Sequence, residues 1–294
     1  MNAYAPSPFE GVRELPAGQP LECLLVVDAG YSHTTVTPLY HGRPIHPACR
    51  RLEVGGKTLS NQLKSVLSRQ AELQKEDWIA NQIKEDCCFV SPTPGDFASN
   101  LERTWKGGTK DPREVDHTLM LDYVLPDYEN IHRGFARPHD PSKDARSRRL
   151  GLAGMPKEDI ITLANERFTV PELLFSPADI GMQQEGAVGT VLQAVNALPE
   201  ALRQAFLANV LVVGGTSLLP GFGERLEFEL RSLIDVETVV RVARPEDPVK
   251  NAWLGGARLA ANEEALRGLV ATKQEYQEHG AQWVSRKFAG KIGR

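Results

Sequence analysis

LLVVDAGYSHTTV, residues 24–36, reads as an apolar strand, a turn and a second strand rich in β-branched residues. The pattern predicts a β-hairpin whose buried first strand ends at Asp28 and whose turn contains Gly30. A carboxylate at a strand end can hold the water shell of Mg²⁺, and a glycine lets phosphate oxygens come close to the backbone. An ordinary hairpin with Asp and Gly in its turn has the same pattern. The hairpin alone therefore leaves a nucleotide site and a plain turn both open.

Two more glycine breaks follow predicted strands. Gly55-Gly56 comes after the strand that starts at residue 50, and Gly214-Gly215-Thr216 comes after the apolar strand at 209–213. In open α/β sheets, ligands gather at the carboxyl ends of strands. Three such breaks, the first of which carries an acid, indicate a nucleotide cleft. Tight packing between strand and helix is the alternative at Gly214-Gly215.

Composition bounds the class of protein. The chain has 294 residues, 41% of them hydrophobic and 24% charged, which suits one large or two ordinary globular domains with a sizeable core. A net charge of −4 provides no overall field that would draw nucleic acid or anionic lipid. The four cysteines and seven histidines show no metal-ligand spacing, so no zinc site is predicted. No stretch approaches the roughly 20 apolar residues of a membrane span.

The order of strands, glycine breaks and helices predicts an α/β architecture. Residues 1–20 are expected to be an irregular linker, 21–91 and 161–248 a split core, 92–160 a divergent and partly irregular insertion, and 249–294 a set of C-terminal helices. Helices are expected after Gly56, from Trp78 to Ser91, at 188–198, from Pro199 to Phe206, at 222–233 and in three pieces between 249 and 288. Further strands are expected near 119–125 and 239–242.

Two local patterns are weaker than they look. Gly56-Lys57-Thr58 lacks the glycine that a phosphate-binding P-loop needs five residues earlier, since Arg51 stands there. The basic run from Arg133 to Arg149 has no interleaved aromatic residues, which favours a solvated loop over a nucleic-acid patch.

From about Leu21 to Ala289 the chain resembles the actin superfamily. Residues 24–42 resemble the second phosphate hairpin of actins, and residues 50–63 and 82–91 resemble the segments that line the adenosine. The same order continues with TLANERFTVPELLFSPADIG (162–181), NVLVVGGTSLLPGF (209–222) and TKQEYQEHG (272–280). The resemblance implies an actin-like α/β fold of the ribonuclease H-like, Hsp70-actin type. The matched part is the second lobe plus the C-terminal helices of the first lobe.

Finer details resemble a nuclear branch of the actin-related proteins. They include DYVLPDY (122–128) and Glu246-Asp247-Pro248 ahead of Ala252-Trp253. This resemblance implies a non-catalytic subunit of an SWR-type chromatin-remodelling complex, which exchanges a core histone for its variant form in nucleosomes. The implied partners are other subunits of the complex and, indirectly, nucleosomal histones; DNA contact stays open, and no membrane is involved. The implied location is the nucleus, with the cytoplasm also open. The alternatives are an ATP-hydrolysing or sugar-kinase-like enzyme of the same fold and a filament-forming cytoskeletal protein.

The resemblance also assigns residues to a nucleotide. Asp28 would hold the metal through water, and Gly30 would face the phosphates. The remaining positions would contact the ribose, adenine and phosphates, from one side Gly56, Lys84 and Glu85, and from the other Gly214, Gly215 and Thr216. A solvated helix face is the alternative for Lys84 and Glu85.

Departures from the family pattern argue against catalysis. Tyr31 stands where actin's hairpin carries a second acid, and Val249 stands where actin places a lysine over the adenine. The first phosphate hairpin of actins has no counterpart in this chain. Losing about three charge-assisted hydrogen bonds would remove ~5–9 kcal/mol, whereas a micromolar site is worth about 8 kcal/mol in total. We therefore expect no cofactor on this chain alone, ATP and Mg²⁺ only in a complete protein, and little or no hydrolysis. Trp253, Leu254, Trp283 and Phe288 are expected to lack a covering surface.

Overall fold

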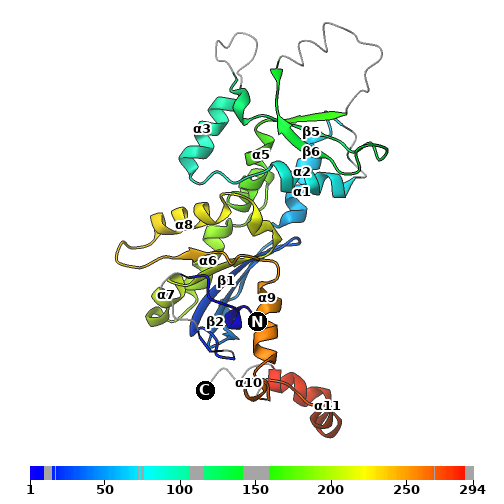
Figure 1. Ribbon diagram of the computed structural model, residues 1–294. Helices are drawn as coiled ribbons and strands as arrows, with labels where there is room; N and C mark the ends of the chain where they lie inside the picture. Colours follow the sequence, from blue (N-terminus) through cyan, green and yellow to red (C-terminus); the bar gives the residue numbers. More distant parts are fainter. Residues whose placement is uncertain are drawn as a thin grey trace.

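The computed structural model describes residues 1–9, 15–16, 18–71, 73, 76–105, 115–141, 159–267 and 269–288. In Figure 1 they form two parts stacked along one long axis, with a large sheet in the lower part and a smaller sheet in the upper part. Of the basic run, Lys143, Arg146, Arg148 and Arg149 lie outside the described residues.

A mixed six-stranded sheet is the framework of the lower part. β1 (Cys23–Ala29) and β2 (Thr34–Tyr40) form the predicted antiparallel hairpin, and β1 pairs in parallel with β8 (Val210–Val213). The strand order is β3-β2-β1-β8-β9, with β4 paired to β2. The short strands are β3 (Arg43–Pro44), β4 (Arg50–Leu52) and β9 (Val242–Ala243). Asp28 lies opposite Val213 in the register, so the carboxyl ends of β1 and β8 meet at one edge of the sheet.

Both faces of this sheet are covered, which is why β1 and β8 are almost continuously apolar. On one face, Leu25 and Val27 pack into a large core. The helices on that side are α6 (Ala187–Asn196), α7 (Glu200–Leu207) and α8 (Phe222–Leu233). On the other face, Leu24 and Val26 pack against residues of the N-terminal segment, including Phe9. Residues 1–20 are thus partly built into a core.

The upper part holds a three-stranded antiparallel sheet. β5 (Leu121–Val124) lies between β6 (Phe135–Pro138) and β7 (Ile160–Leu163). The helices there are α1 (Gly56–Leu67), α2 (Asp77–Cys87), α3 (Pro94–Thr104) and α5 (Glu166–Thr169). Short 3-10 helices complete the chain, namely η1 (Asn2–Tyr4), η2 (His46–Ala48), η3 (His117–Leu119), η4 (Pro171–Leu174), η5 (Pro177–Ile180) and η6 (Gly215–Leu218).

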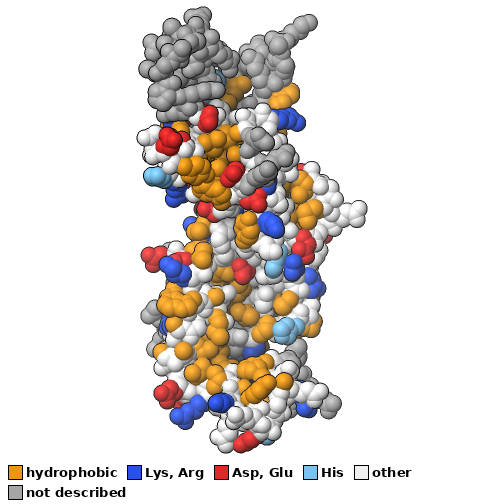
Figure 2. All heavy atoms as spheres, turned by 90° about the vertical axis from the view of Figure 1, so that its right-hand side faces the viewer, with side chains coloured by type: hydrophobic (Ala, Val, Ile, Leu, Met, Phe, Trp, Pro, Cys, Tyr) orange, Lys and Arg blue, Asp and Glu red, His pale blue; other side chains and the backbone are white. Residues whose placement is uncertain are grey.

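Three C-terminal helices leave the lower part, as predicted. They are α9 (Asn251–Ala260), α10 (Glu263–Arg267) and α11 (Lys273–Phe288). The expected exposure is confirmed for Trp253 (68%), Phe288 (56%) and Leu254 (37%). Trp283 is instead half-buried, because its ring lies against His279 and under the ammonium of Lys287. Figure 2, which views the side of the molecule on which α9 runs, shows hydrophobic side chains gathered over the lower half of this face. Among the described helices, none is both long and apolar enough to cross a lipid bilayer.

Several boundaries differ from the sequence predictions. α3 was not among the expected helices, since Pro92 and Pro94 follow the helix expected to end at Ser91 and can end a helix as well as begin one. Pro94 stands in the first turn of α3, where proline favours helix initiation. Its start is capped by the Thr93 hydroxyl, which accepts from the Asp96 amide at 3.0 Å. α2 ends at Cys87 rather than Ser91, because the Phe89 and Val90 amides donate to other segments. Pro199 caps α7 instead of opening its first turn.

Candidate functional site

The three predicted glycine turns meet at one carbonyl group. The Gly56 amide donates to the Gly30 carbonyl oxygen at 3.1 Å, and the Thr216 hydroxyl donates to the same oxygen at 2.8 Å. Thus the hairpin turn, the start of α1 and the start of η6 are joined directly. The structure brings the three turns together, as the sequence predicted.

Gly214 is held against the end of β1. Its φ is +93°, and a Cβ atom there would lie 2.4 Å from the Ala29 carbonyl oxygen and 2.7 Å from Asp28 Oδ1. The chain's own packing therefore requires this glycine, although its close neighbour is the end of strand β1 and not the helix that the packing alternative expected. Gly215 differs, because a Cβ atom there would have no neighbour within 4 Å. Its backbone faces open space.

A cavity of about 420 Å³ opens beside these turns, within the range of small-molecule sites. Four of the predicted ligand-contacting residues line this cavity. The two residues that depart from the actin pattern, Tyr31 and Val249, also line it, as do two leucines. The lining residues are Tyr31, Lys84, Glu85, Gly215, Thr216, Leu218, Leu219 and Val249. The leucines were missed, since only their position after the Gly-Gly-Thr turn marks them. Tyr31, Leu218 and Val249 are each at least half exposed, so the cavity mouth is apolar.

Lys84 is buried, with only 4% of its surface exposed. Its ammonium donates to the Gly56 carbonyl at 3.2 Å, to Ser60 Oγ at 3.1 Å and to Asn81 Oδ1 at 2.6 Å. An ammonium has three protons, and all three have partners. Burial lowers the pKa of Lys84, partly offset by Glu85. The solvated helix face proposed as an alternative for this residue is wrong.

The helical pattern of α2 carried a signal for this burial. Ile79, Ala80, Ile83, Lys84 and Cys87 are its buried residues, and their spacing defines one face of a helix. A lysine on that face must bring its charge to interior acceptors, because an unpaired buried charge is costly. Glu85 lies off this face and is exposed, as its solvated alternative predicted; its carboxylate accepts from Asn81 Nδ2 at 2.7 Å.

Asp28 is exposed at the end of β1. Partial desolvation of its carboxylate nevertheless raises its pKa, and the nearby His33 opposes this increase. One carboxylate suits contact with a metal through water rather than a direct ligand set. Among the described residues, no group of three acidic, histidine or cysteine side chains is arranged to hold a metal ion. Asp28 thus fits an outer contact to Mg²⁺ and supplies no complete site.

The parallel β1–β8 pair, the β1–β2 hairpin and the pocket at the carboxyl ends of these strands define a mixed α/β protein whose cavity lies at the edge of the sheet. The actin family model matches residues 12–289. The chain belongs to the actin family, and its mixed α/β fold is that of the family.

Within the actin family, the chain is similar to several curated actin-related proteins. The chain is 54% identical over 280 residues to "Actin-like protein arp6" of Emericella nidulans, which covers 93% of this chain and 58% of that protein. It is 48% identical to "Actin-related protein 6" of Neurospora crassa, over 93% of this chain and 61% of the relative. The protein of the same name from Drosophila melanogaster is 38% identical, over 91% and 62% respectively. The chain thus spans about three fifths of the length of these relatives.

Proposed function

We propose that this chain acts as a non-catalytic, actin-related subunit of an SWR-type nuclear chromatin-remodelling complex, which exchanges a core histone for its variant form. The support is the 54% identity to an actin-like protein arp6, together with the nuclear-branch motifs at 122–128 and 246–253. In this proposal the chain supplies the second lobe of an actin-type molecule and the C-terminal helices that return to the first. Its partners are other subunits of the complex and, through them, nucleosomes.

The hydrogen bonds of Lys84 support the proposed non-catalytic role. All three of its protons are engaged within the chain, so the lysine offers none to a phosphate or ribose in this arrangement. Tyr31, at the position of an acid in actin, adds a phenol ring to the pocket. A phenol ring cannot orient an attacking water as a carboxylate does.

A nucleotide would find only part of its usual actin-type surroundings among the residues of this pocket. Gly215, Thr216 and Glu85 would face a base and ribose, and Asp28 would contact the water shell of Mg²⁺. Mg²⁺ would supply charge neutralisation for the phosphates. The chain's own residues would orient the nucleoside end and exclude water through Tyr31, Leu218 and Val249.

Purification of the tagged protein from nuclei tests this function. We expect a large remodelling assembly in the purified material and no ATP turnover by the isolated chain. Turnover that disappears in Asp28→Ala would overturn the non-catalytic role. A pellet formed with ATP and Mg²⁺ in sedimentation would favour a cytoskeletal protein instead.

A further inference from the structure

A polar network behind the pocket links α1 and α2. Lys84, on α2, reaches the first-turn carbonyl of Gly56 and the hydroxyl of Ser60, both on α1. Asn81, one turn earlier on α2, accepts from Lys84 and from the Ser60 hydroxyl at 3.2 Å. Ser60 is only 4% exposed, so water cannot readily replace these bonds.

The same network is continuous with the glycine turns. Gly56, whose carbonyl accepts from Lys84, donates its amide to Gly30, and Thr216 donates to Gly30 from the other side. The Lys57 amide donates to the Tyr31 carbonyl at 2.7 Å. These contacts join the hairpin turn to the starts of α1 and η6.

We propose that Lys84 is an internal cross-link that holds the pocket wall in place of a nucleotide. The hydrogen bonds that position the wall are made within the chain, so the wall is preformed. The stability of the chain should then depend on Lys84 and be indifferent to Mg²⁺ and ATP. This inference does not depend on the complex to which the chain belongs.

The chemistry of Lys84 distinguishes a cross-link from a ligand-binding residue. A ligand-binding lysine keeps at least one proton for its ligand, and removing it weakens binding with little effect on stability. A cross-linking lysine leaves buried acceptors without donors when it is removed, which destabilises the fold. Lys84 donates to the Gly56 carbonyl, Ser60 Oγ and Asn81 Oδ1. Without Lys84, the single Ser60 hydroxyl proton could serve either the Gly56 carbonyl at 3.0 Å or Asn81 Oδ1 at 3.2 Å, and the other acceptor would lose its donor.

Thermal unfolding of the full chain tests the proposal. The variant Lys84→Met keeps most of the side-chain volume and removes the charge and the three bonds. The matched control is Lys57→Met, because Lys57 is an exposed lysine in the first turn of α1. We expect Lys84→Met to lower the unfolding midpoint by several degrees and Lys57→Met to leave it unchanged. Mg²⁺ with ATP should leave the midpoint of the wild-type chain where it was.

Two results would overturn the proposal. One is a saturable rise of the wild-type midpoint with Mg²⁺ and ATP; the other is a Lys84→Met midpoint equal to that of the wild type. If Lys84→Met does not yield folded protein, Ser60→Ala removes one acceptor and should lower the midpoint by a smaller amount; an unchanged midpoint there would also overturn the cross-link. None of these measurements involves the remodelling complex. A result that contradicts the Lys84 cross-link is therefore distinct from a co-purification result that contradicts the proposed function.

Discussion

The two glycines at the end of β8 differ, since Gly214 is packed against β1 and Gly215 faces open space. We predict that Gly214→Ala destabilises the chain by about 1–3 kcal/mol or more, because alanine would have to adopt a positive φ beside the Ala29 carbonyl. The matched variant Gly215→Ala adds a methyl group that meets no atom within 4 Å. It should change stability by no more than about 0.5 kcal/mol. Urea unfolding of both proteins measures the difference, and equal effects would contradict the packing role of Gly214.

Asp28 provides a test of metal binding and of pH dependence. Its pKa is raised in the folded state, mainly by desolvation. Because the native state binds this proton more tightly than the unfolded chain does, the ionised carboxylate is a small cost at neutral pH. That cost disappears as the pH falls through the raised pKa.

We therefore predict that Asp28→Asn leaves the unfolding midpoint equal or slightly higher at pH 7. The two proteins should converge in acid, and the exposure of Asp28 keeps the difference small. Mg²⁺ alone should shift neither midpoint, since one carboxylate offers a single outer contact. A Mg²⁺-dependent rise seen in the wild type and lost in Asp28→Asn would show that the carboxylate does hold the metal.

Helix α8 is joined to η4 by a buried ion pair. Arg225 donates to Glu172 at 2.6 and 3.2 Å and to the Ser91 carbonyl at 3.1 Å, and it also contacts Glu229. Both charged partners of the pair are at most 5% exposed. Removal of one leaves a buried charge or a set of unmatched polar groups.

We predict that Glu172→Gln and Arg225→Met each destabilise the chain by about 3–5 kcal/mol. The double variant should lose clearly less than the sum of the two, because both substitutions break the same Arg225–Glu172 contact, while Glu229 still pairs with Arg225 when Glu172 is changed. A double-mutant cycle from denaturant unfolding measures this coupling. Strict additivity would mean that the two side chains act independently.

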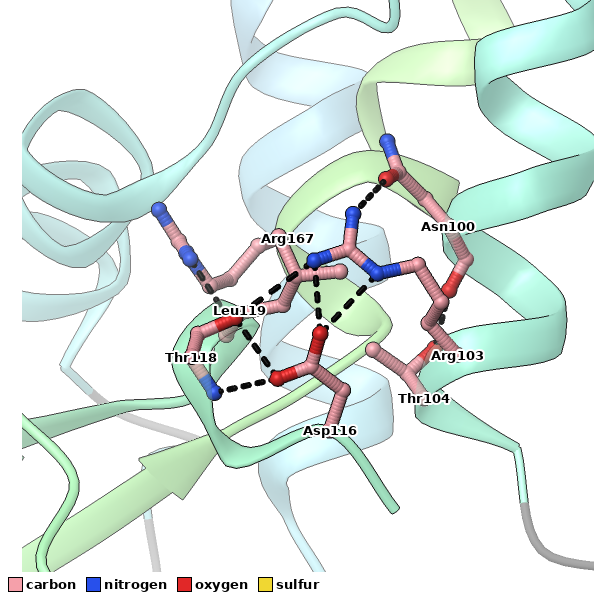
Figure 3. Close-up of polar contacts among 7 residues, drawn as sticks. All are labelled: Asn100, Arg103, Thr104, Asp116, Thr118, Leu119 and Arg167. Atoms are coloured by element: carbon pink, nitrogen blue, oxygen red, sulfur yellow. Dashed lines mark hydrogen bonds and ion pairs between the residues drawn. The ribbon is translucent and has the colours of Figure 1, made fainter. Parts of the chain in front are cut away.

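A second ion pair joins the last turn of α3 to η3 (Figure 3). Asp116 accepts from Thr118 and from Arg103 at 2.6 and 3.0 Å, while Arg167 donates to the Leu119 carbonyl beside them. Hydrogen bonds from Thr118, followed by that from Arg103, lower the pKa of Asp116 to about 2. Because the pKa is depressed in the folded state, the ionised Asp116 carboxylate stabilises the fold fully above the ordinary aspartate pKa of about 4. This stabilisation is lost as the pH falls through about 2.

We predict that amide exchange at Thr118 becomes faster as the pH is lowered from about 4 to 2, after correction for the intrinsic rate. In Asp116→Asn the corrected rate should show no such step. Asp127, whose own turn lowers its pKa to about 2, should titrate identically in both proteins and serves as an internal reference. A step that persists in Asp116→Asn would assign it to another group.

Elements whose residues alternate between apolar and polar, or form apolar runs bounded by glycine, were predictable from the sequence. The β1–β2 hairpin and β8 belong to this class, and the meeting of their turns followed from the rule that strand ends face one edge. α6 and α8 were predictable from apolar residues at helical spacing. α3 was not predictable from pattern alone, because proline both ends and begins helices. β6 and β7 have four residues each and gain their identity only by pairing with β5. The resemblance placed Lys84 beside the ligand, and the side chain does line the pocket. Its burial was not predicted, because lysine is usually exposed and two of its three acceptors lie on α1.

One large core runs through the molecule and joins its two parts. It contains residues of the lower sheet, such as Val212, and residues of the upper sheet, such as Ile161. The opposite face of the lower sheet has a thinner cover, to which η1 contributes, and α9 packs against η1. Gly255 allows their close contact, since a Cβ atom there would lie 2.1 Å from the Met1 carbonyl oxygen. The inner side of α9 is thus packed, while Trp253 projects outward with 68% of its surface exposed.

The two sides of α9 should therefore respond differently to truncation. We predict that Leu259→Ala, on the buried side, costs about 2–5 kcal/mol of stability. Trp253→Ala should change the free energy of unfolding by no more than about 0.5 kcal/mol, because the exposed indole ring packs little against the core. If α9 faces other subunits in the proposed complex, Trp253→Ala should nevertheless reduce the amount of remodeller that co-purifies with the tagged chain. Denaturant unfolding and quantitative mass spectrometry of the purified material measure the two effects. A Trp253→Ala protein that unfolds as early as Leu259→Ala, or one that retains the full complement of partners, would place the interaction surface elsewhere.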